Sequence, residues 1–167
     1  METDYRIGLG YDAHPFAEGR SLVLGGVKIP YARGLSGHSD ADAVCHAIGD
    51  ALLGAASAGD MGQLFPGTDP EYAGISSLVL LSRVTDLLKS RGVRIVNLDA
   101  MIILEEPHVS KYFAEMREKI AAALGMDARN VSVKATRNEG MGFIGRGEGV
   151  AAFAVALVML PRGETNP

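Results

Sequence analysis

The sequence predicts an α/β (α+β) fold in which a mixed sheet of four to five strands carries helices on one face. Two kinds of pattern lead to this prediction: short stretches that alternate apolar and polar residues, and longer stretches with apolar residues at helical spacing. The segment 150–160 is almost wholly apolar, which is typical of a strand buried on both faces. The helices are too few to cover both faces of the sheet, so we expect a symmetric oligomer that packs sheet faces together.

The chain of 167 residues is expected to form one domain, 1–167, with a flexible tail after about residue 161. A strand over 5–11 comes first. A hairpin over 21–29 follows, because Gly25-Gly26 suits a tight turn between two short strands.

Caps and apolar faces predict the helices. Ser39 and Asp42 are expected to form a capping box at the start of the first helix, 40–58. A long loop over 59–74 follows, and loops of this length are usually functional or mobile. The remaining predicted elements are a helix over 75–90, a strand over 93–104, a helix over 107–124 ended by Gly125, a strand over 130–136, a Gly-rich connection over 140–149 and the strand over 150–160.

The composition narrows the possible functions. The formal net charge is −4 and no basic run is present, which argues against nucleic-acid binding. No apolar run approaches the length of a membrane span and no secretion signal is recognisable, so we expect a cytoplasmic protein, or one of the plastid stroma if the source is a plant or an apicomplexan. The single cysteine, Cys45, is expected to be buried and inert and fits a reducing compartment.

A split set of metal-type ligands is the main chemical signal. Asp12 and His14 are two residues apart at a predicted strand end, so their side chains point to the same side, and His46 follows on the first helix. One carboxylate and two imidazoles suit zinc and leave a coordination position open for catalysis. Asp42 or Asp50 is a candidate to orient the His46 ring. Alternatively, these are ordinary turn, loop and helix residues.

Two loops have the character of phosphate or hydroxyl sites. The segment 34–40 brings small residues and His38 to a helix N-terminus, where free N–H groups can bind an anion. The segment 59–70 places Asp60 and Asp69 among glycines and prolines, where they can bind a second cation or sugar-like hydroxyls. A plain capping loop and a solvated surface loop are the alternatives.

A third candidate loop leaves the strand over 130–136. Lys134, Thr136 and Arg137 suit phosphate contacts, and Glu139 suits Mg²⁺. The segment lacks the spacing of a P-loop or of a Rossmann fingerprint. A long Gly-rich hairpin with incidental charges is the alternative.

Taken in order, five motifs resemble the 2-C-methyl-D-erythritol 2,4-cyclodiphosphate synthase family over roughly residues 6–160. They are Gly-Tyr-Asp-Ala-His, Gly-Gly-Val-Lys-Ile-Pro, His-Ser-Asp-Ala-Asp, Gly-Asp-Met-Gly-Gln-Leu-Phe-Pro-Gly-Thr-Asp and Gly-Arg-Gly-Glu-Gly. The resemblance implies a ferredoxin-like subunit in a homotrimer that packs its sheets around a central axis, with active sites between neighbouring subunits. It also implies an enzyme, a phosphorus–oxygen lyase of the non-mevalonate route to isoprenoid and terpenoid precursors.

The implied substrate is 4-diphosphocytidyl-2-C-methyl-D-erythritol 2-phosphate. Its 2-phosphate attacks the β-phosphorus, CMP leaves, and 2-C-methyl-D-erythritol 2,4-cyclodiphosphate forms. By the same resemblance, Asp12, His14 and His46 hold one zinc ion per subunit, and Glu139 binds a magnesium or manganese ion that bridges the diphosphate.

Further roles follow from the resemblance. His38, Thr136 and Arg137 would be catalytic; Phe143 and Arg146 would lie near the trimer's central channel. Hydroxyl contacts of the substrate would fall to the 59–70 loop, and the cytidine pocket to segments 104–110 and 136–139 of the adjacent subunit. The implied substrate-binding residues are Asp12, His14, His38, Ser39, Asp60, Met61, Gly62, Phe65, Pro66, Gly67, Thr68, Asp69, Leu104, Glu105, Pro107, His108, Lys134, Thr136, Arg137, Asn138, Glu139, Phe143 and Arg146.

The chain departs from the family pattern at two positions. Arg137 stands where a hydroxyl residue usually follows Thr136, and His108 stands where a Lys or Arg is commoner. On the residues alone, two other functions stay open: a small trimeric binding protein that uses the metal without turnover, and a metal-dependent phosphodiesterase or nuclease. The absence of a basic groove disfavours the latter.

Overall fold

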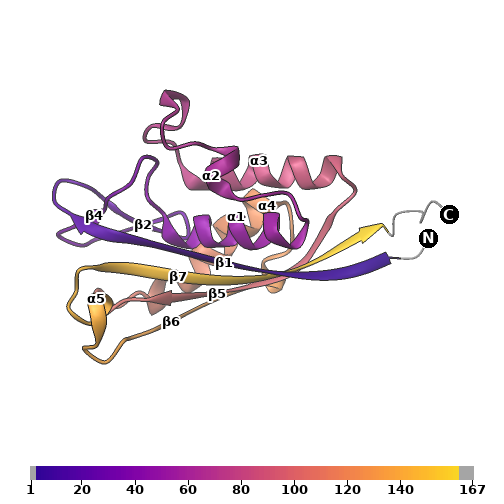
Figure 1. Ribbon diagram of the computed structural model, residues 1–167. Helices are drawn as coiled ribbons and strands as arrows, with labels where there is room; N and C mark the ends of the chain where they lie inside the picture. Colours follow the sequence, from indigo (N-terminus) through magenta and orange to yellow (C-terminus); the bar gives the residue numbers. More distant parts are fainter. Residues whose placement is uncertain (1–2, 162–167) are drawn as a thin grey trace.

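The chain folds into a five-stranded mixed sheet with helices packed on one face (Figure 1). The computed structural model describes residues 3–161, so the tail expected after residue 161 lies outside the described residues. The strand order is β4-β1-β7-β5-β6, and β2 and β3 form a separate hairpin. The elements are β1 (Thr3–Ala17), β2 (Leu22–Leu24), β3 (Val27–Ile29), β4 (Gly34–Leu35), α1 (Ala43–Ala55), α2 (Met61–Leu64), η1 (Pro70–Tyr72), α3 (Ser77–Ser90), β5 (Arg94–Ile103), η2 (Ser110–Tyr112), α4 (Phe113–Leu124), η3 (Ala128–Asn130), β6 (Val131–Thr136), α5 (Gly142–Gly145) and β7 (Gly149–Pro161).

The predicted mixed sheet is confirmed, but its connections differ from those of a ferredoxin-like subunit. β1 pairs antiparallel with β7 from Thr3↔Pro161 to Pro15↔Gly149, and β7 pairs antiparallel with β5. β5 and β6 are parallel and are joined through α4. A direct parallel β-α-β unit of this kind replaces the β-α-β-β-α-β order that defines the ferredoxin-like pattern.

The first strand is longer than predicted. Its pairing with β7 continues to Pro15, so Asp12 and His14 lie within β1 rather than at its tip. Helix α1 packs on this part of β1 because Gly8 and Gly10 carry no side chain. A Cβ added at Gly10 would lie 1.8 Å from the Ala47 backbone oxygen, well inside a van der Waals contact. Close approach of α1 to β1 is therefore built into the sequence.

The start of α1 differs from the predicted capping box. Asp42, not Ser39, is the N-cap, and its carboxylate accepts from the backbone N–H groups of Val44 and Cys45. The same carboxylate accepts from both glycines of the β2–β3 turn. A carboxylate with four backbone donors is a stronger cap than a serine hydroxyl, and the helix begins at Ala43 rather than at residue 40.

Other boundaries also shift. The loop over 59–74 contains α2 and η1, and the connection over 140–149 contains α5. The helix predicted from residue 107 begins as η2 and continues as α4 from Phe113; Gly125, in a left-handed conformation, ends it as expected. Cys45 is fully buried, as predicted.

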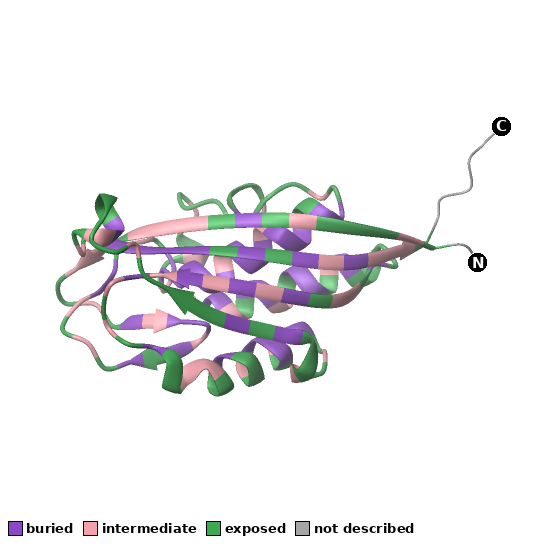
Figure 2. Cartoon of the chain, turned by 90° about the horizontal axis from the view of Figure 1, so that it is seen from below, coloured by how far each residue is buried: buried purple, intermediate pink, exposed green. Residues whose placement is uncertain are grey.

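One sheet face is uncovered in the single chain. Figure 2 shows the sheet from this side, with exposed residues along β1 and β7. The prediction that β7 is buried on both faces is wrong for the isolated subunit, because Phe153 and Val155 are 39% and 46% exposed. The exposed large apolar residues of β1 are Tyr5, Ile7, Leu9 and Tyr11. Among the described residues, no helix combines the length and apolar character needed to cross a membrane.

Candidate metal and phosphate site

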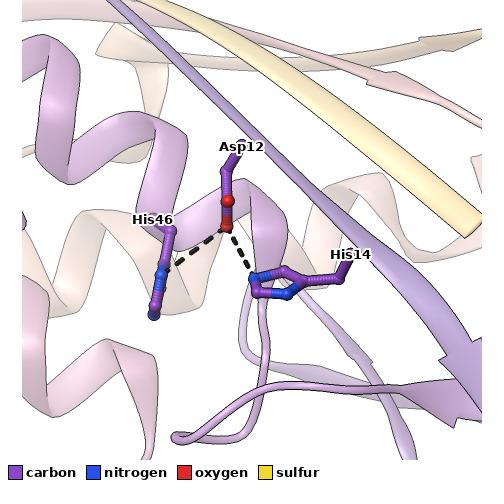
Figure 3. Close-up of side chains that lie close together, drawn as sticks. All are labelled: Asp12, His14 and His46. Atoms are coloured by element: carbon purple, nitrogen blue, oxygen red, sulfur yellow. Dashed lines mark ion pairs between the residues drawn. The ribbon is translucent and has the colours of Figure 1, made fainter. Parts of the chain in front are cut away.

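Asp12, His14 and His46 converge at the contact between β1 and α1 (Figure 3). Asp12 and His14 alternate on the helix-facing side of β1, and His46 lies in the first turn of α1. The Asp12 Oδ2 atom lies 2.9 Å from His14 Nε2 and 3.6 Å from His46 Nδ1. One candidate ligand atom from each residue falls within 4.8 Å of the others. The convergence predicted from spacing is confirmed.

These side chains fit a divalent cation. Asp12 Oδ2 and His14 Nε2 are buried and, among the described residues, neither has a hydrogen-bond partner of acceptable geometry, although they lie close together. Buried polar atoms are rarely left unsatisfied in a native protein. Two imidazole nitrogens and one carboxylate oxygen that face a common point are the donor set of a catalytic zinc site with an open position.

Electrostatics around His14 follow from its neighbours. Burial lowers the pKa of His14, but the negative charge of the nearby Asp12 carboxylate raises it and the Ser36 backbone adds to the increase, so the net shift is upward. A metal ligand must be a neutral imidazole, so a cation at this site displaces a proton held more tightly than usual.

The side chain that orients His46 is not the one predicted. Ser39 Oγ lies 3.2 Å from His46 Nε2, the ring nitrogen opposite Asp12. Asp42 is occupied by its four backbone donors, and Asp50 accepts from the Met61 N–H at 2.7 Å. The expectation that Asp42 or Asp50 orients His46 is therefore wrong.

A cavity of about 230 Å³ opens beside the three ligands. His38 forms part of its wall, and the His38 Nε2 atom is hydrogen-bonded to the Asp69 carbonyl at 2.8 Å. Arg20 holds the same loop by donating to the carbonyls of Gly37 and Ser39 at 3.0 and 2.8 Å. The residues that line the cavity are His14, His38, Ser39, His46, Met61, Gly62, Phe65, Gly67, Tyr72 and Leu80.

A second cavity, of about 250 Å³, lies beyond the ends of the parallel strands β5 and β6. The carboxyl ends of parallel strands are common ligand sites. This cavity shares no lining residue with the first. Its lining residues are Leu104, Glu105, Pro107, His108, Val109, Ser110, Phe113, Ala135, Thr136 and Arg137.

Known proteins match this chain over nearly its whole length. The model of the YgbB family matches residues 5–159. The chain belongs to the YgbB family. The 2-C-methyl-D-erythritol 2,4-cyclodiphosphate synthases of Chlorobium phaeobacteroides and Symbiobacterium thermophilum are 57% and 58% identical to it, over 93% and 91% of this chain and 98% and 97% of theirs. The resemblance drawn from the five motifs is confirmed.

Solved structures agree with this family. A CDP complex of IspF from Plasmodium falciparum matches with a TM-score of 0.82 and 32% identity, covering 97% of this chain and 100% of that one. The bifunctional IspDF from Campylobacter jejuni matches with a TM-score of 0.92 and 36% identity, covering 96% of this chain and 43% of the longer protein. The same fold therefore occurs in a CDP-bound relative and in a two-function chain.

Within this fold, most residues expected to bind substrate fall on the two cavities. Asp60 and Asp69 adjoin residues that line the first cavity: Asp60 precedes Met61, and the Asp69 carbonyl is hydrogen-bonded to His38. Each also caps a short helix, because Asp60 accepts from the Gln63 N–H and Asp69 from the Glu71 N–H. Pro66 and Thr68 belong to the same exposed loop.

Four expected residues lie elsewhere. Lys134 makes an ion pair with Asp99 on the uncovered sheet face. Phe143 and Asn138 line a shallow hollow with Tyr11 and Phe153. Arg146 pairs with Glu148. In a single chain these side chains are not brought to either cavity, and their proposed contacts stay predictions.

Glu139 fits the expected second cation. It is exposed at the end of β6 and, within the described residues, makes no ion pair. Magnesium prefers one or two carboxylates together with phosphate oxygens and water, so a free carboxylate beside Thr136 and Arg137 has the right chemistry.

Sequence reasoning missed several lining residues. Tyr72 and Leu80 line the metal cavity, and Phe113 and Ala135 line the second one. Only Tyr72 carried a signal, as an aromatic residue in a long loop. The others are apolar residues of regular elements, whose cavity-facing side depends on the packing.

Proposed function

We propose that this chain is a 2-C-methyl-D-erythritol 2,4-cyclodiphosphate synthase, a phosphorus–oxygen lyase of isoprenoid precursor biosynthesis. It would convert 4-diphosphocytidyl-2-C-methyl-D-erythritol 2-phosphate into the cyclic diphosphate and CMP. The observation that carries this proposal is the convergence of Asp12, His14 and His46 beside a cavity, in a chain more than half identical to synthases of that name. The buried, unpaired Cys45 is compatible with a cytoplasmic location.

We propose a homotrimer in which each active site combines the metal cavity of one subunit with the second cavity of its neighbour. Two features support this. The two cavities are lined by separate parts of the chain, as expected if each active site combines one cavity from each of two neighbouring subunits. An apolar patch also lies open on the sheet and fits an interface. It consists of Tyr5, Ile7, Leu9, Tyr11, Phe153 and Val155.

Zinc at Asp12, His14 and His46 would supply positive charge to phosphate oxygens, and magnesium or manganese at Glu139 would supply it to the diphosphate. The chain's own groups would hold the reacting phosphates. His38 and Ser39 border the metal cavity, and Thr136 and Arg137 border the second one. The attacking 2-phosphate oxygen is already an anion, so no general base is needed, and charge neutralisation with in-line positioning accounts for catalysis.

The decisive experiment incubates the zinc-loaded protein with the cytidylyl substrate and Mg²⁺ and follows phosphorus species by ³¹P NMR. We expect CMP and the cyclic diphosphate in equal amounts, and neither after chelation of metals. Linear hydrolysed phosphates would instead identify a phosphodiesterase. No CMP above the metal-free control would identify a binding protein. Sedimentation equilibrium tests the trimer, with an expected mass three times the 17.6 kDa chain.

A further inference from the structure

A tight turn at the end of β6 carries Glu139. The Met141 N–H donates to the Asn138 carbonyl at 2.9 Å and closes the turn. Its central residues, Glu139 and Gly140, have φ angles of 52° and 76°. Turns with positive φ at both central positions favour glycine, asparagine or aspartate, and a glutamate there is strained. Strain of this kind persists only where the surroundings enforce it, and it concentrates at functional sites.

The enforcing group is the carboxylate of Glu105, which follows β5. Its Oε1 atom accepts from the N–H groups of Asn138 at 2.8 Å and Gly140 at 3.3 Å. These two amides flank Glu139 in the chain. Its Oε2 atom lies 3.4 Å from Arg137 Nε, and the Glu105 side chain is only 15% exposed. Hydrogen bonds from backbone N–H groups to a carboxylate are charge-assisted and therefore strong.

The two glutamates thus have opposite environments. Glu105 is half-buried, and both of its carboxylate oxygens contact the loop over 137–140. The Glu139 side chain is exposed and has no ion pair among the described residues. Glu105 is therefore poorly placed to contact substrate directly, although it lines the second cavity.

We propose that Glu105 is a positioning residue that holds the 137–140 turn in its strained form, so that Glu139 presents its carboxylate to the divalent cation of the substrate diphosphate. The same carboxylate fixes Arg137 against the cavity wall. The proposal rests on the proposed function, because that function supplies the diphosphate and its cation.

The two oxygens of Glu105 have separable tasks. Glutamine at this position keeps a carbonyl oxygen for the two backbone N–H groups but loses the charge that pairs with Arg137. Alanine removes both. The control is Asp127, the N-cap of η3, which accepts from the Arg129 N–H at 2.8 Å and pairs with the Arg129 guanidinium at 2.8 Å, outside both cavities.

The test measures Mn²⁺ affinity of the CDP-bound protein by electron paramagnetic resonance, and amide hydrogen exchange of Asn138 and Gly140. Glu105→Ala should weaken Mn²⁺ binding by about tenfold or more, the usual effect of losing a group that orients a metal ligand. It should also speed exchange at both amides. Glu105→Gln should weaken Mn²⁺ binding less than Glu105→Ala does, and Asp127→Ala should match wild type.

Wild-type Mn²⁺ affinity in Glu105→Ala would overturn the proposal, as would a Glu105→Gln protein as weak as Glu105→Ala. Unprotected Asn138 and Gly140 amides in the wild type would overturn it even if Glu105→Ala fails to fold. CMP formation by the wild type is assayed separately. A protein that makes no CMP but loses Mn²⁺ binding in Glu105→Ala refutes the proposed function and leaves the positioning role standing.

Discussion

Substituting Gly10 by alanine should move the candidate metal ligands apart without replacing any of them. A Cβ at this position would lie 1.8 Å from the Ala47 carbonyl oxygen, whereas an ordinary Cβ contact begins near 3.4 Å. Helix α1 must therefore move away from β1 by roughly the difference, and His46 moves with it. Metal sites tolerate about 0.2 Å of error in ligand distance, so we expect Gly10→Ala to lose most of its zinc.

The cost in stability can be bounded. Overpacking a well-packed contact costs about 1–3 kcal/mol. For a domain of this size that corresponds to a fall in Tm of about 2–12 °C. The measurements are zinc content by elemental analysis and thermal unfolding followed by circular dichroism, both on the purified protein.

Gly54 provides the matched control. It also lies on α1, but an added Cβ there meets nothing within 4 Å. Gly54→Ala should keep its zinc and gain up to about 1 kcal/mol from helix propensity. If Gly10→Ala kept full zinc content and wild-type stability, the close contact between α1 and β1 would not be what positions His46.

Four further outcomes follow from the site. His46→Ala should leave a folded protein that retains no zinc, and one zinc per chain by elemental analysis would disprove its assignment as a ligand. Because the pKa of His14 is raised, zinc affinity in chelator competition should fall by about tenfold per pH unit below that pKa, as one proton is displaced. The stability of the metal-free protein should depend on pH in the opposite direction. His14 contributes stability that is present below its unfolded pKa of about 6.5 and is lost as the pH rises through the raised folded pKa. Chemical denaturation should therefore give a lower free energy of unfolding at pH 8 than at pH 6, and equal values would contradict the prediction. Asp60→Ala should raise KM with little change in kcat, and an unchanged KM in steady-state assays would argue against a role with substrate hydroxyls.

Local patterns were sufficient to predict a mixed sheet and the convergence of Asp12, His14 and His46. Alternation placed Asp12 and His14 on one side of a strand, and helical spacing placed His46 on the next helix. The capping box failed because Ser39 and Asp42 both have cap chemistry, and the choice depends on the β2–β3 turn, which is distant in sequence. The residues around Asp42 in the sequence do not indicate that its carboxylate will accept hydrogen bonds from Gly25 and Gly26.

The strained turn at Glu139 shows the same limit. Its sequence, Glu139-Gly140, does not favour a turn with two positive φ angles, and the carboxylate that enforces it comes from Glu105, at the end of another strand. The sequence predicted that these residues serve one site. It did not reveal that one glutamate holds the other, because that depends on the parallel pairing of β5 and β6.

Thr3 pairs with Pro161 in the antiparallel ladder of β1 and β7, so the first and last described residues lie side by side at one end of the sheet. A short peptide joining them would close the backbone into a ring without disturbing a ladder bond. New ends could then be opened at Gly19, an exposed turn residue at which an added Cβ meets no other atom. The order in which the strands are synthesised is thus separable from their arrangement in space, and a circularly permuted chain should assemble the same three-ligand centre.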